Sequence, residues 1–281
     1  MTADTASPPA PAFRRELPDP TSVRRTVLEM LYRSRASHLG SSMSLIEILI
    51  AIYGACDVDA IRARQPGRDR VFVSKGHGAA ATYATMYHFG LISGDDIATY
   101  HLDGSLLAGH VSHVVPGVEH STGALGHGLP VAVGTAIGLA SAHFDDALVF
   151  CVLGDGEIQE GSVWEALLLA SHHRLRRLIP VVDNNHISSI TQTSKVIDMA
   201  PLGDRFRGFG FAVHEVDGHD VAAIGEAIEI IRHQDGPSVI IADTIKGKGV
   251  PFAEGQPVWH YRSLDDKSFT AAMEALSGGS L

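Results

Sequence analysis

Two spacings of apolar residues along this chain predict two kinds of element. Apolar positions recur at helical spacing over residues 21–36 and 44–54, and both segments are expected to face a core. Short continuous apolar runs predict buried strands, and the clearest is the run ALVFCVL at 147–153. The other predicted elements are strands at 70–74, 178–182, 211–216 and 238–243, and helices after Gly76 and at 124–143, 160–173 and 222–232.

The order of these elements predicts the fold class. Strands that alternate with helices favour an α/β fold with a doubly wound parallel sheet and helices on both faces. In such folds the ligand binds beyond the carboxyl ends of the strands. Residues 1–20 hold five prolines and no apolar stretch, so we expect a flexible arm there and no signal peptide. A single domain is then expected over residues 21–281.

Composition and charge narrow the class of protein. Apolar residues make up 45% and charged residues 19% of the 281 positions, which is typical of a soluble globular protein. The 22 basic and 32 acidic residues give a net charge of −10, and no dense basic cluster favours nucleic-acid binding. No apolar window reaches the roughly 18 residues that cross a membrane. The two cysteines, Cys56 and Cys151, lie in apolar surroundings, which favours a reducing cytoplasm over a disulfide framework.

A candidate metal and diphosphate site follows two of the predicted strands. The strand at 147–153 ends in Gly154, Asp155 and Gly156, and the next strand is followed by Asn185, thirty residues after Asp155. One βαβ unit has about that length, so the two side chains can emerge side by side from neighbouring strands. Carboxylate and amide oxygens suit Mg²⁺ or Ca²⁺, which can also hold a diphosphate. The segment lacks the third glycine of a dinucleotide fingerprint, which disfavours NAD.

Several segments together resemble the thiamine diphosphate-binding domain of transketolases. They are GDGEIQEGSVWEALLLASHHRL followed by LIPVVDNN, SHLGSSMSLIEILIAIYG, RDRVFVSKGHGAAATYA, GHVSHVVPGVEHSTGALGHGLPVAVGTAIG, and TIKGKGV with the later WH. The resemblance runs in the family's order from Thr21 to about Asp265. Because the family continues with two further domains, the chain resembles the amino-terminal subunit of a split transketolase.

The resemblance implies a cofactor and a set of site residues. Thiamine diphosphate would bind with Mg²⁺ or Ca²⁺, the metal being held by Asp155, Asn185 and the backbone carbonyl of Ile187. The residues implied for cofactor binding are Gly123, Ala124, Leu125, Gly154, Asp155, Gly156, Glu157, Asn185 and His77. Those implied for catalysis are His38, His77, His110, His260 and Glu160. Of these, His77 and His260 would lie near the diphosphate and the first substrate carbons, whereas His38 and His110 would bind hydroxyls and move protons.

The resemblance also implies a reaction and a partner. The family transfers a two-carbon ketol unit from a ketose to an aldose, so sugars or sugar phosphates are the expected substrates. The glutamate that activates the cofactor would come from a separate chain that carries the pyrimidine-binding domain, and Glu160 would meet it at the subunit contact. The small-residue helix over 124–142, with Gly126, Gly128, Gly134 and Gly138, suits close contact. We therefore expect self-association and a heterotetramer with two partner chains.

The chain departs from the family pattern at several positions. Val111 and His127 stand where the family usually has proline and glutamine, and Tyr261 replaces a small residue after His260. The stretch from Asn185 to Ile190 replaces an Asn-Gly-x-x-x-x-Gly pattern. These changes predict a different acceptor pocket.

Three lysines and the overall function have alternative interpretations. Lys75, Lys246 and Lys248 either contact phosphate or are solvated charges, as lysines at strand ends usually are. The chain could belong to another thiamine diphosphate enzyme, such as a deoxyxylulose phosphate synthase or a pyruvate dehydrogenase component. It could also be a regulatory paralogue without catalytic activity, although a decayed site would be expected to lose several of its polar residues.

Overall fold

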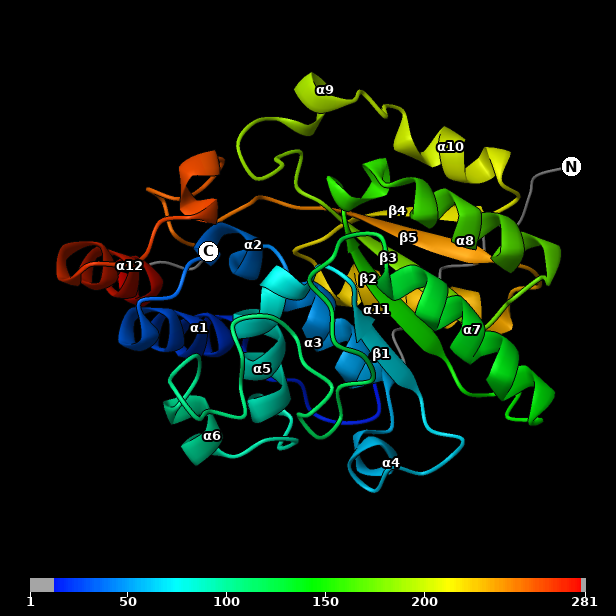
Figure 1. Cartoon of the computed structure of the whole chain (residues 1–281), viewed down its shortest axis with the longest axis horizontal. Coiled ribbons are helices and arrows are strands. Elements are labelled where there is room, and N and C mark those ends of the chain that lie inside the picture. Colours follow the sequence, from blue (N-terminus) through cyan, green and yellow to red (C-terminus); the bar gives the residue numbers. More distant parts are fainter. Residues whose placement is uncertain (1–12, 279–281) are drawn as a thin grey trace, which may run out of the picture.

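A sheet of five parallel strands forms the centre of the computed structural model, which describes residues 13–278 (Figure 1). The strands are β1 (Arg70–Val73), β2 (Val149–Gly154), β3 (Leu178–Asn184), β4 (Ala212–Asp217) and β5 (Ser238–Asp243). Their order across the sheet is β1-β2-β3-β5-β4, and every neighbouring pair is parallel. The doubly wound α/β fold predicted from the sequence is confirmed.

Helices cover both faces of the sheet, because the central strands are apolar on both sides. On β2, Phe150 and Val152 pack into one core with α1 (Pro20–Ser34), α3 (Ile46–Ala55), α5 (Ala79–His88) and α11 (Val221–His233). The alternate residues Cys151 and Leu153 pack into a second core with α7 (Gly128–Ser141), α8 (Gly161–His172) and α10 (Leu202–Gly208). This alternation across a pleated strand explains why ALVFCVL is apolar throughout.

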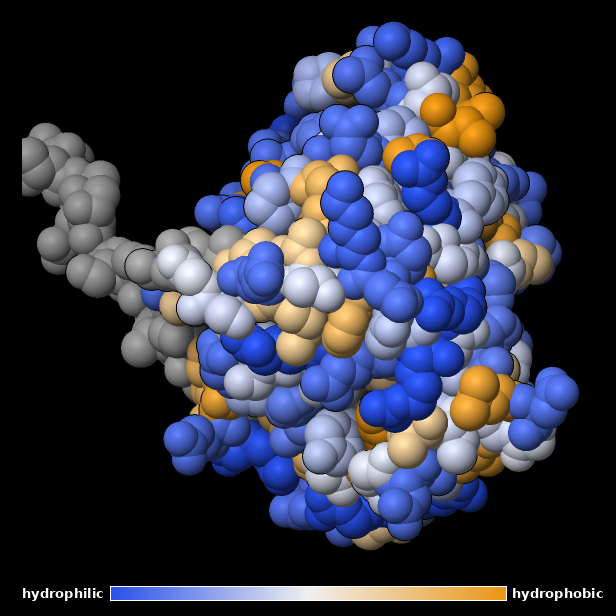
Figure 2. Space-filling model, turned by 90° about the vertical axis from the view of Figure 1, so that its left-hand side faces the viewer, coloured by the Kyte–Doolittle hydropathy of each residue, from blue (hydrophilic) through white to orange (hydrophobic). Residues whose placement is uncertain are grey.

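The remaining helices and turns lie between and after these helices. They are α2 (Leu39–Met43), α4 (Val58–Arg62), α6 (Gly94–Ala98), α9 (Thr193–Val196) and α12 (Asp266–Gly278), with the 3-10 turns η1 (Gly76–Gly78), η2 (Glu157–Gln159) and η3 (Pro257–His260). On the face that carries α12, hydrophilic residues predominate and apolar residues form small separate groups (Figure 2). Among the described residues, no helix has the length and apolar character to cross a membrane.

The strand predictions agree with the structure to within two residues at each end, and β5 has the predicted bounds. The helix predicted over 124–143 is the largest error, since α7 begins only at Gly128. The predicted helix includes Gly126, which instead has a φ of +80° and lies in the loop before α7. The small residues of this segment fit a helical pattern. The sequence therefore did not reveal a loop whose glycine has a left-handed backbone conformation.

The amino-terminal arm is described only from residue 13. The flexible arm predicted over 1–20 lies outside the described residues up to residue 12. From there, Phe13 and Leu17 pack against the first core, and the amide of Arg14 donates to the carbonyl of Gly54 at 2.9 Å. Asp19 then caps α1 by accepting a hydrogen bond from the amide of Ser22 at 3.0 Å. Residues 13–19 are thus part of the packed domain, which corrects the predicted arm over that stretch.

Candidate active site

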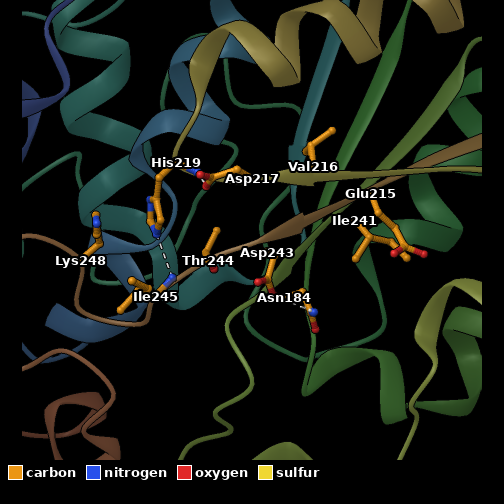
Figure 3. Close-up of a pocket in the computed structure, with 10 residues that line it drawn as sticks. All are labelled: Asn184, Glu215, Val216, Asp217, His219, Ile241, Asp243, Thr244, Ile245 and Lys248. Atoms are coloured by element: carbon orange, nitrogen blue, oxygen red, sulfur yellow. Dashed lines mark hydrogen bonds between the residues drawn. The ribbon is translucent and has the colours of Figure 1, made fainter.

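A cavity of about 470 Å³ lies at the carboxyl ends of β1, β2 and β3 and collects most of the residues singled out from the sequence. Its lining includes the four candidate histidines, the 154–157 turn, the segment that starts at Asn185, and Lys246. A larger cavity of about 660 Å³ lies at the carboxyl ends of β4 and β5 (Figure 3). Of the residues singled out from the sequence, the larger cavity contains Lys248 and none of the predicted catalytic, cofactor-binding or metal-binding residues, so the smaller one is the candidate site.

The four histidines come from four separate segments and meet in this cavity. The ring of His38 lies 5.6 Å from His77, 5.4 Å from His110 and 5.0 Å from His260, measured between ring centroids. His77 and His260 are 5.2 Å apart. His38 has a φ of +72°, which non-glycine residues rarely adopt, and its amide donates to the carbonyl of His260 at 3.0 Å. Such strain is typical of functional positions, where the surrounding structure holds it in place.

The surroundings keep all four imidazoles neutral near pH 7. Burial, with the nearby His110 and Lys246, lowers the pKa of His38 to about 4. Burial and Lys246 lower the pKa of His260 to about 3. The pKa values of His77 and His110 are lowered mainly by burial as well. A neutral imidazole carries one donor and one acceptor, so the cluster can bind hydroxyl groups and exchange protons with them.

Asp155 is buried at the end of β2 and is incompletely hydrogen-bonded. Parallel pairing sets Gly154 opposite Asp183, so β2 and β3 end side by side as predicted. Oδ1 of Asp155 accepts the amide of Gly156 at 2.7 Å, whereas Oδ2 is buried and has no hydrogen-bond partner among the described residues. Burial and the neighbouring Asp183 raise the pKa of Asp155 to about 6. A buried carboxylate oxygen without a partner is costly unless a cation occupies its open side.

Asp183, one strand away, has the opposite surroundings. Its carboxylate accepts hydrogen bonds from the hydroxyl of Ser44 at 2.7 Å, from the hydroxyl of Thr244 and from the ammonium of Lys75. Burial alone would raise the pKa of Asp183, but Lys75 and these hydrogen bonds outweigh it and hold the pKa below its usual range. Both members of the Lys75–Asp183 pair are almost fully buried. Lys75 is therefore not a solvated charge, and it lines the cavity as the buried partner of Asp183.

Asn185, Ile187 and Lys246 line another part of the same cavity. Nδ2 of Asn185 donates to Asp183 at 3.2 Å, and its Oδ1 accepts the amide of Ile187 at 3.2 Å. The ammonium of Lys246 is held by the carbonyl of Ile187 at 2.9 Å and that of Ser188 at 2.8 Å. Burial and Lys75 lower the pKa of Lys246 to about 8. The carbonyl implied as a metal ligand thus already faces a positive charge.

The donor set fits a hard divalent cation only if a ligand contributes oxygens. The described residues contain no group of three His, Cys, Asp or Glu side chains that could hold a metal. A cation at Asp155 would have one carboxylate, the amide oxygen of Asn185 and the carbonyl of Ile187, and a diphosphate would have to supply further oxygens. The open oxygen of Asp155 is suited to that arrangement, whereas Oδ1 of Asn185 and the carbonyl of Ile187 each already accept a hydrogen bond within the protein.

Glu157 holds the two loops of the site together. Its carboxylate accepts the amide of Gly126 at 2.8 Å, the amide of Gly154 at 3.1 Å and the hydroxyl of Ser74, and burial raises its pKa. Glu157 lines the cavity, but its oxygens are engaged by the protein. Glu157 therefore links the loop at Gly126 to the turn at Gly154, a structural role that its place in the GDGE sequence did not reveal.

Only part of the 123–127 loop lines the cavity, and Glu160 lies outside it. Gly123 and Leu125 line the cavity, while Ala124 is exposed outside it. A Cβ at Gly126 would lie 2.8 Å from Cβ of Glu160, so only glycine permits this contact. Glu160 itself is exposed and does not line the cavity. The structure therefore separates Glu160 from the histidine cluster.

The sequence interpretation missed several residues of the site. Ser41 lines the cavity, and its hydroxyl lies 3.4 Å from Nδ1 of His260. His186 lies beside the site and outside the cavity lining; it stands where the family pattern has glycine, has a φ of +63°, and its Nε2 lies 2.6 Å from Oδ1 of Asp243. A departure from glycine at this position was the only available signal for that strained conformation.

Comparisons with known proteins agree with this geometry. Residues 21–278 match the family model described as transketolase, thiamine diphosphate binding domain. The chain is 38% identical over 258 residues to one of the apulose-4-phosphate transketolase subunits of Actinobacillus succinogenes, covering 91% of this chain and 93% of that protein. It is 34% identical to 6-deoxy-6-sulfo-D-fructose transketolase subunit SqwG of a Clostridium species, covering 90% and 93%. The crystal structure of Campylobacter jejuni transketolase superposes with a TM-score of 0.84 at 29% identity, covering 92% of this chain and 42% of that one.

Proposed function

This chain belongs to the transketolase family as a thiamine diphosphate-binding domain, and we propose that it is the cofactor-binding subunit of a two-chain transketolase. The reaction would transfer a two-carbon ketol unit from a ketose to an aldose. Two relatives of nearly the same length are named as transketolase subunits, and both names specify sugar-derived substrates. By contrast, the chain spans 42% of the Campylobacter transketolase. These lengths support a division of the enzyme between two chains.

The single observation that carries the proposal is the open oxygen of Asp155. Oδ2 is buried at the mouth of the GDG turn without a hydrogen-bond donor among the described residues. We infer that Asp155, Asn185 and the carbonyl of Ile187 hold Mg²⁺, or Ca²⁺, with the diphosphate of the cofactor. The glycines at 154 and 156 allow the backbone to approach that group. Lys246, whose ammonium reaches the carbonyls of Ile187 and Ser188 in the same cavity, would supply a positive charge to the phosphate groups.

The bound cofactor would supply the carbon nucleophile that breaks and forms carbon–carbon bonds beside a carbonyl. The protein's part is to position the sugar and move protons. His77 and His260 lie next to each other and would contact the diphosphate end and the first substrate carbons. His38 and His110 would hold hydroxyl groups, with the neutral rings acting as donor or acceptor as needed.

The partner would complete the open side of the cavity. The small residues Gly134 and Gly138 on α7 have nothing within 4 Å of a Cβ position, so another backbone can approach them closely. Large apolar side chains are also exposed on α8 and beside the cavity. They include Leu168, Leu169, Ile190, Val196 and Ile197. Exposed apolar groups of this kind are typical of contact surfaces. Glu160, the exposed residue before α8, would meet the activating glutamate of the partner.

Complementation tests the proposed reaction. The purified chain is assayed for ketol transfer alone and after addition of a candidate chain that carries the pyrimidine-binding domain. We expect little turnover alone and a large gain on mixing, because the activating glutamate belongs to the partner. Appreciable turnover by the chain alone would contradict the proposal, and a partner whose own activity changes without any ketol transfer would favour a regulatory paralogue.

Light scattering tests the proposed assembly. We expect the chain to form a dimer that takes up two partner chains, since closed two-fold assemblies are the commonest. A chain that stays monomeric both alone and in the mixture would overturn the assembly part of the proposal.

A further inference from the structure

A chain of hydrogen bonds that runs from the buried Arg24–Glu47 pair to the surface lies behind the candidate site, on the side of the larger cavity. Nδ1 of His219 lies 3.1 Å from Oε2 of Glu47, and Nε2 of His219 accepts the amide of Ile245 at 2.8 Å (Figure 3). Glu47 also binds Arg24, with one guanidinium nitrogen at 2.6 Å and another at 2.9 Å. Nε of Arg24 donates to the carbonyl of Lys248 at 3.2 Å. The network therefore joins α1 and α3 to the loop that follows β5.

These contacts determine the protonation of His219. Because the amide of Ile245 can only donate, Nε2 of His219 is the acceptor, and the ring proton lies on Nδ1 and is donated to Glu47. Burial works to raise the pKa of Glu47, but the hydrogen bond from His219 and the charge of Arg24 outweigh it and keep the pKa low. Glu47 is thus a charged carboxylate whose partners fix both the tautomer and the orientation of His219.

The loop held in this way carries Lys246 into the candidate site. Ile245 and Lys248, the two anchored positions, lie on either side of Lys246. The amide of Gly247 donates to the carbonyl of Gly40 at 2.9 Å, which fixes the inner side of the same loop. Lys246 itself is buried and reaches the carbonyls of Ile187 and Ser188. The side chain of His219 lies outside the candidate site, in the lining of the second cavity (Figure 3).

We propose that His219, oriented by Glu47, is a positioning residue that holds the 244–250 loop so that the ammonium of Lys246 points into the cofactor cavity. The inference rests on the proposed function only in taking Lys246 to face the cofactor's phosphates. Lys246 has a long, flexible stem, so fixing the backbone on both sides of it limits where its charge can lie. Removal of the anchor at Ile245 would leave the charge present but poorly placed.

The first test is hydrogen exchange of the full chain without cofactor. His219→Phe keeps a ring of similar size and removes both hydrogen bonds. His214→Phe is the matched control, because His214 lies on β4, is also partly buried and has one side-chain hydrogen bond, to Gln234 at 3.2 Å. We expect exchange at residues 244–250 to accelerate roughly tenfold in His219→Phe, the equivalent of about one hydrogen bond, and to be unchanged in His214→Phe. Unchanged exchange in His219→Phe would overturn the proposal.

The second test is a double-mutant cycle on cofactor affinity. Thiamine diphosphate with Mg²⁺ is titrated into the wild type, His219→Phe, Lys246→Ala and the double variant. If His219 acts through Lys246, its substitution weakens binding roughly tenfold in the wild type and adds almost nothing in the Lys246→Ala background. Additive effects of the two substitutions would contradict the proposal.

Two further outcomes are distinguishable. If His219→Phe does not fold, His219→Gln takes its place, since the amide oxygen can still accept from Ile245 and should restore most of the exchange protection. Failure of Gln to protect the loop would then count against the proposal. If the wild type binds no thiamine diphosphate, the proposed function fails, while hydrogen exchange still decides whether His219 holds the loop.

Discussion

Asp155 and Asp183 lie at the ends of neighbouring parallel strands, and their surroundings differ in nearly every respect. Asp183 accepts hydrogen bonds from Ser44, Lys75 and Thr244 and has a lowered pKa. Asp155 has one buried oxygen without a donor among the described residues, and its pKa is raised to about 6. Donors from the protein itself stabilise the charge of Asp183. The charge of Asp155 depends on a bound cation for the same stabilisation.

This difference separates a structural carboxylate from a binding one. Burial alone does not distinguish them, because both side chains are buried. The number of donors aimed at each carboxylate does, since incompletely satisfied buried charges are typical of functional sites. The contrast also explains why Lys75 and Lys246 differ: Lys75 neutralises Asp183, whereas Lys246 donates to the neutral carbonyls of Ile187 and Ser188.

The largest effect should come from breaking the buried ion pair between Lys75 and Asp183. Asp183→Asn leaves the buried ammonium of Lys75 without its counter-charge, which we expect to cost about 3–5 kcal/mol of the free energy of unfolding. Urea unfolding of the chain measures the loss. Asp243→Asn, at the end of β5 on an exposed carboxylate, is the matched control and should change stability by under about 1 kcal/mol. Equal losses in the two variants would show that the Lys75–Asp183 pair contributes no more to stability than an exposed carboxylate does, against its interpretation as a structural pair.

An intermediate effect should appear in the pH dependence of Asp155. Its pKa in the folded chain is about 6, above the ordinary value of 3.8, so the folded state binds this proton more tightly than the unfolded state does. Stability is therefore lost as pH rises from about 4 to 6, by about 3 kcal/mol in all. Without divalent metal, Asp155→Asn should be more stable than the wild type at pH 7 and similar to it near pH 4.

The difference between the two unfolding curves isolates Asp155, because the histidine contributions are common to both chains. Mg²⁺ with thiamine diphosphate should stabilise the wild type and leave the variant unchanged. A wild type that equals or exceeds Asp155→Asn in stability at pH 7, without metal, would show that the open oxygen carries no cost.

The smallest effect should come from removing one donor to Asp183. Ser44→Ala deletes the hydrogen bond of 2.7 Å and should cost about 2 kcal/mol, a typical contribution of a hydrogen bond to a charged group. Ser42→Ala is the control on the same segment, since the hydroxyl of Ser42 is buried without a partner among the described residues. Thermal or urea unfolding should show no loss for Ser42→Ala, and a cost for Ser42 equal to that of Ser44 would contradict the account.

The sequence could predict one of these carboxylates and not the other. Asp155 follows an apolar strand and lies between two glycines, so both its position and its openness to a ligand were visible in a local pattern. The pairing of Lys75 with Asp183 joins residues 108 positions apart and leaves no local signal. For the same reason the interpretation of Lys75 as a solvated charge is wrong, since its side chain is buried against Asp183.

The loops of the site show the same limit. The strands could be predicted well because burial on both faces demands continuous apolar runs, as in β2 and β5. The start of α7 could not, because Gly123 and Gly126 need backbone angles that no helix provides, with φ of +154° and +80°. The clustering of the four histidines was predicted from the family resemblance. No periodicity could predict it, since the segments that carry them are spread from residue 38 to residue 260.

The measurement that tests the central claim most directly is the binding of thiamine diphosphate to the purified chain, with and without Mg²⁺, for the wild type and Asp155→Asn. We predict that the wild type binds with a strong dependence on Mg²⁺ and that the variant, while folded, loses this dependence and binds at least a hundredfold more weakly. That factor corresponds to about 2.7 kcal/mol. Equal, metal-dependent binding by the two proteins would show that the open oxygen of Asp155 does not hold the metal.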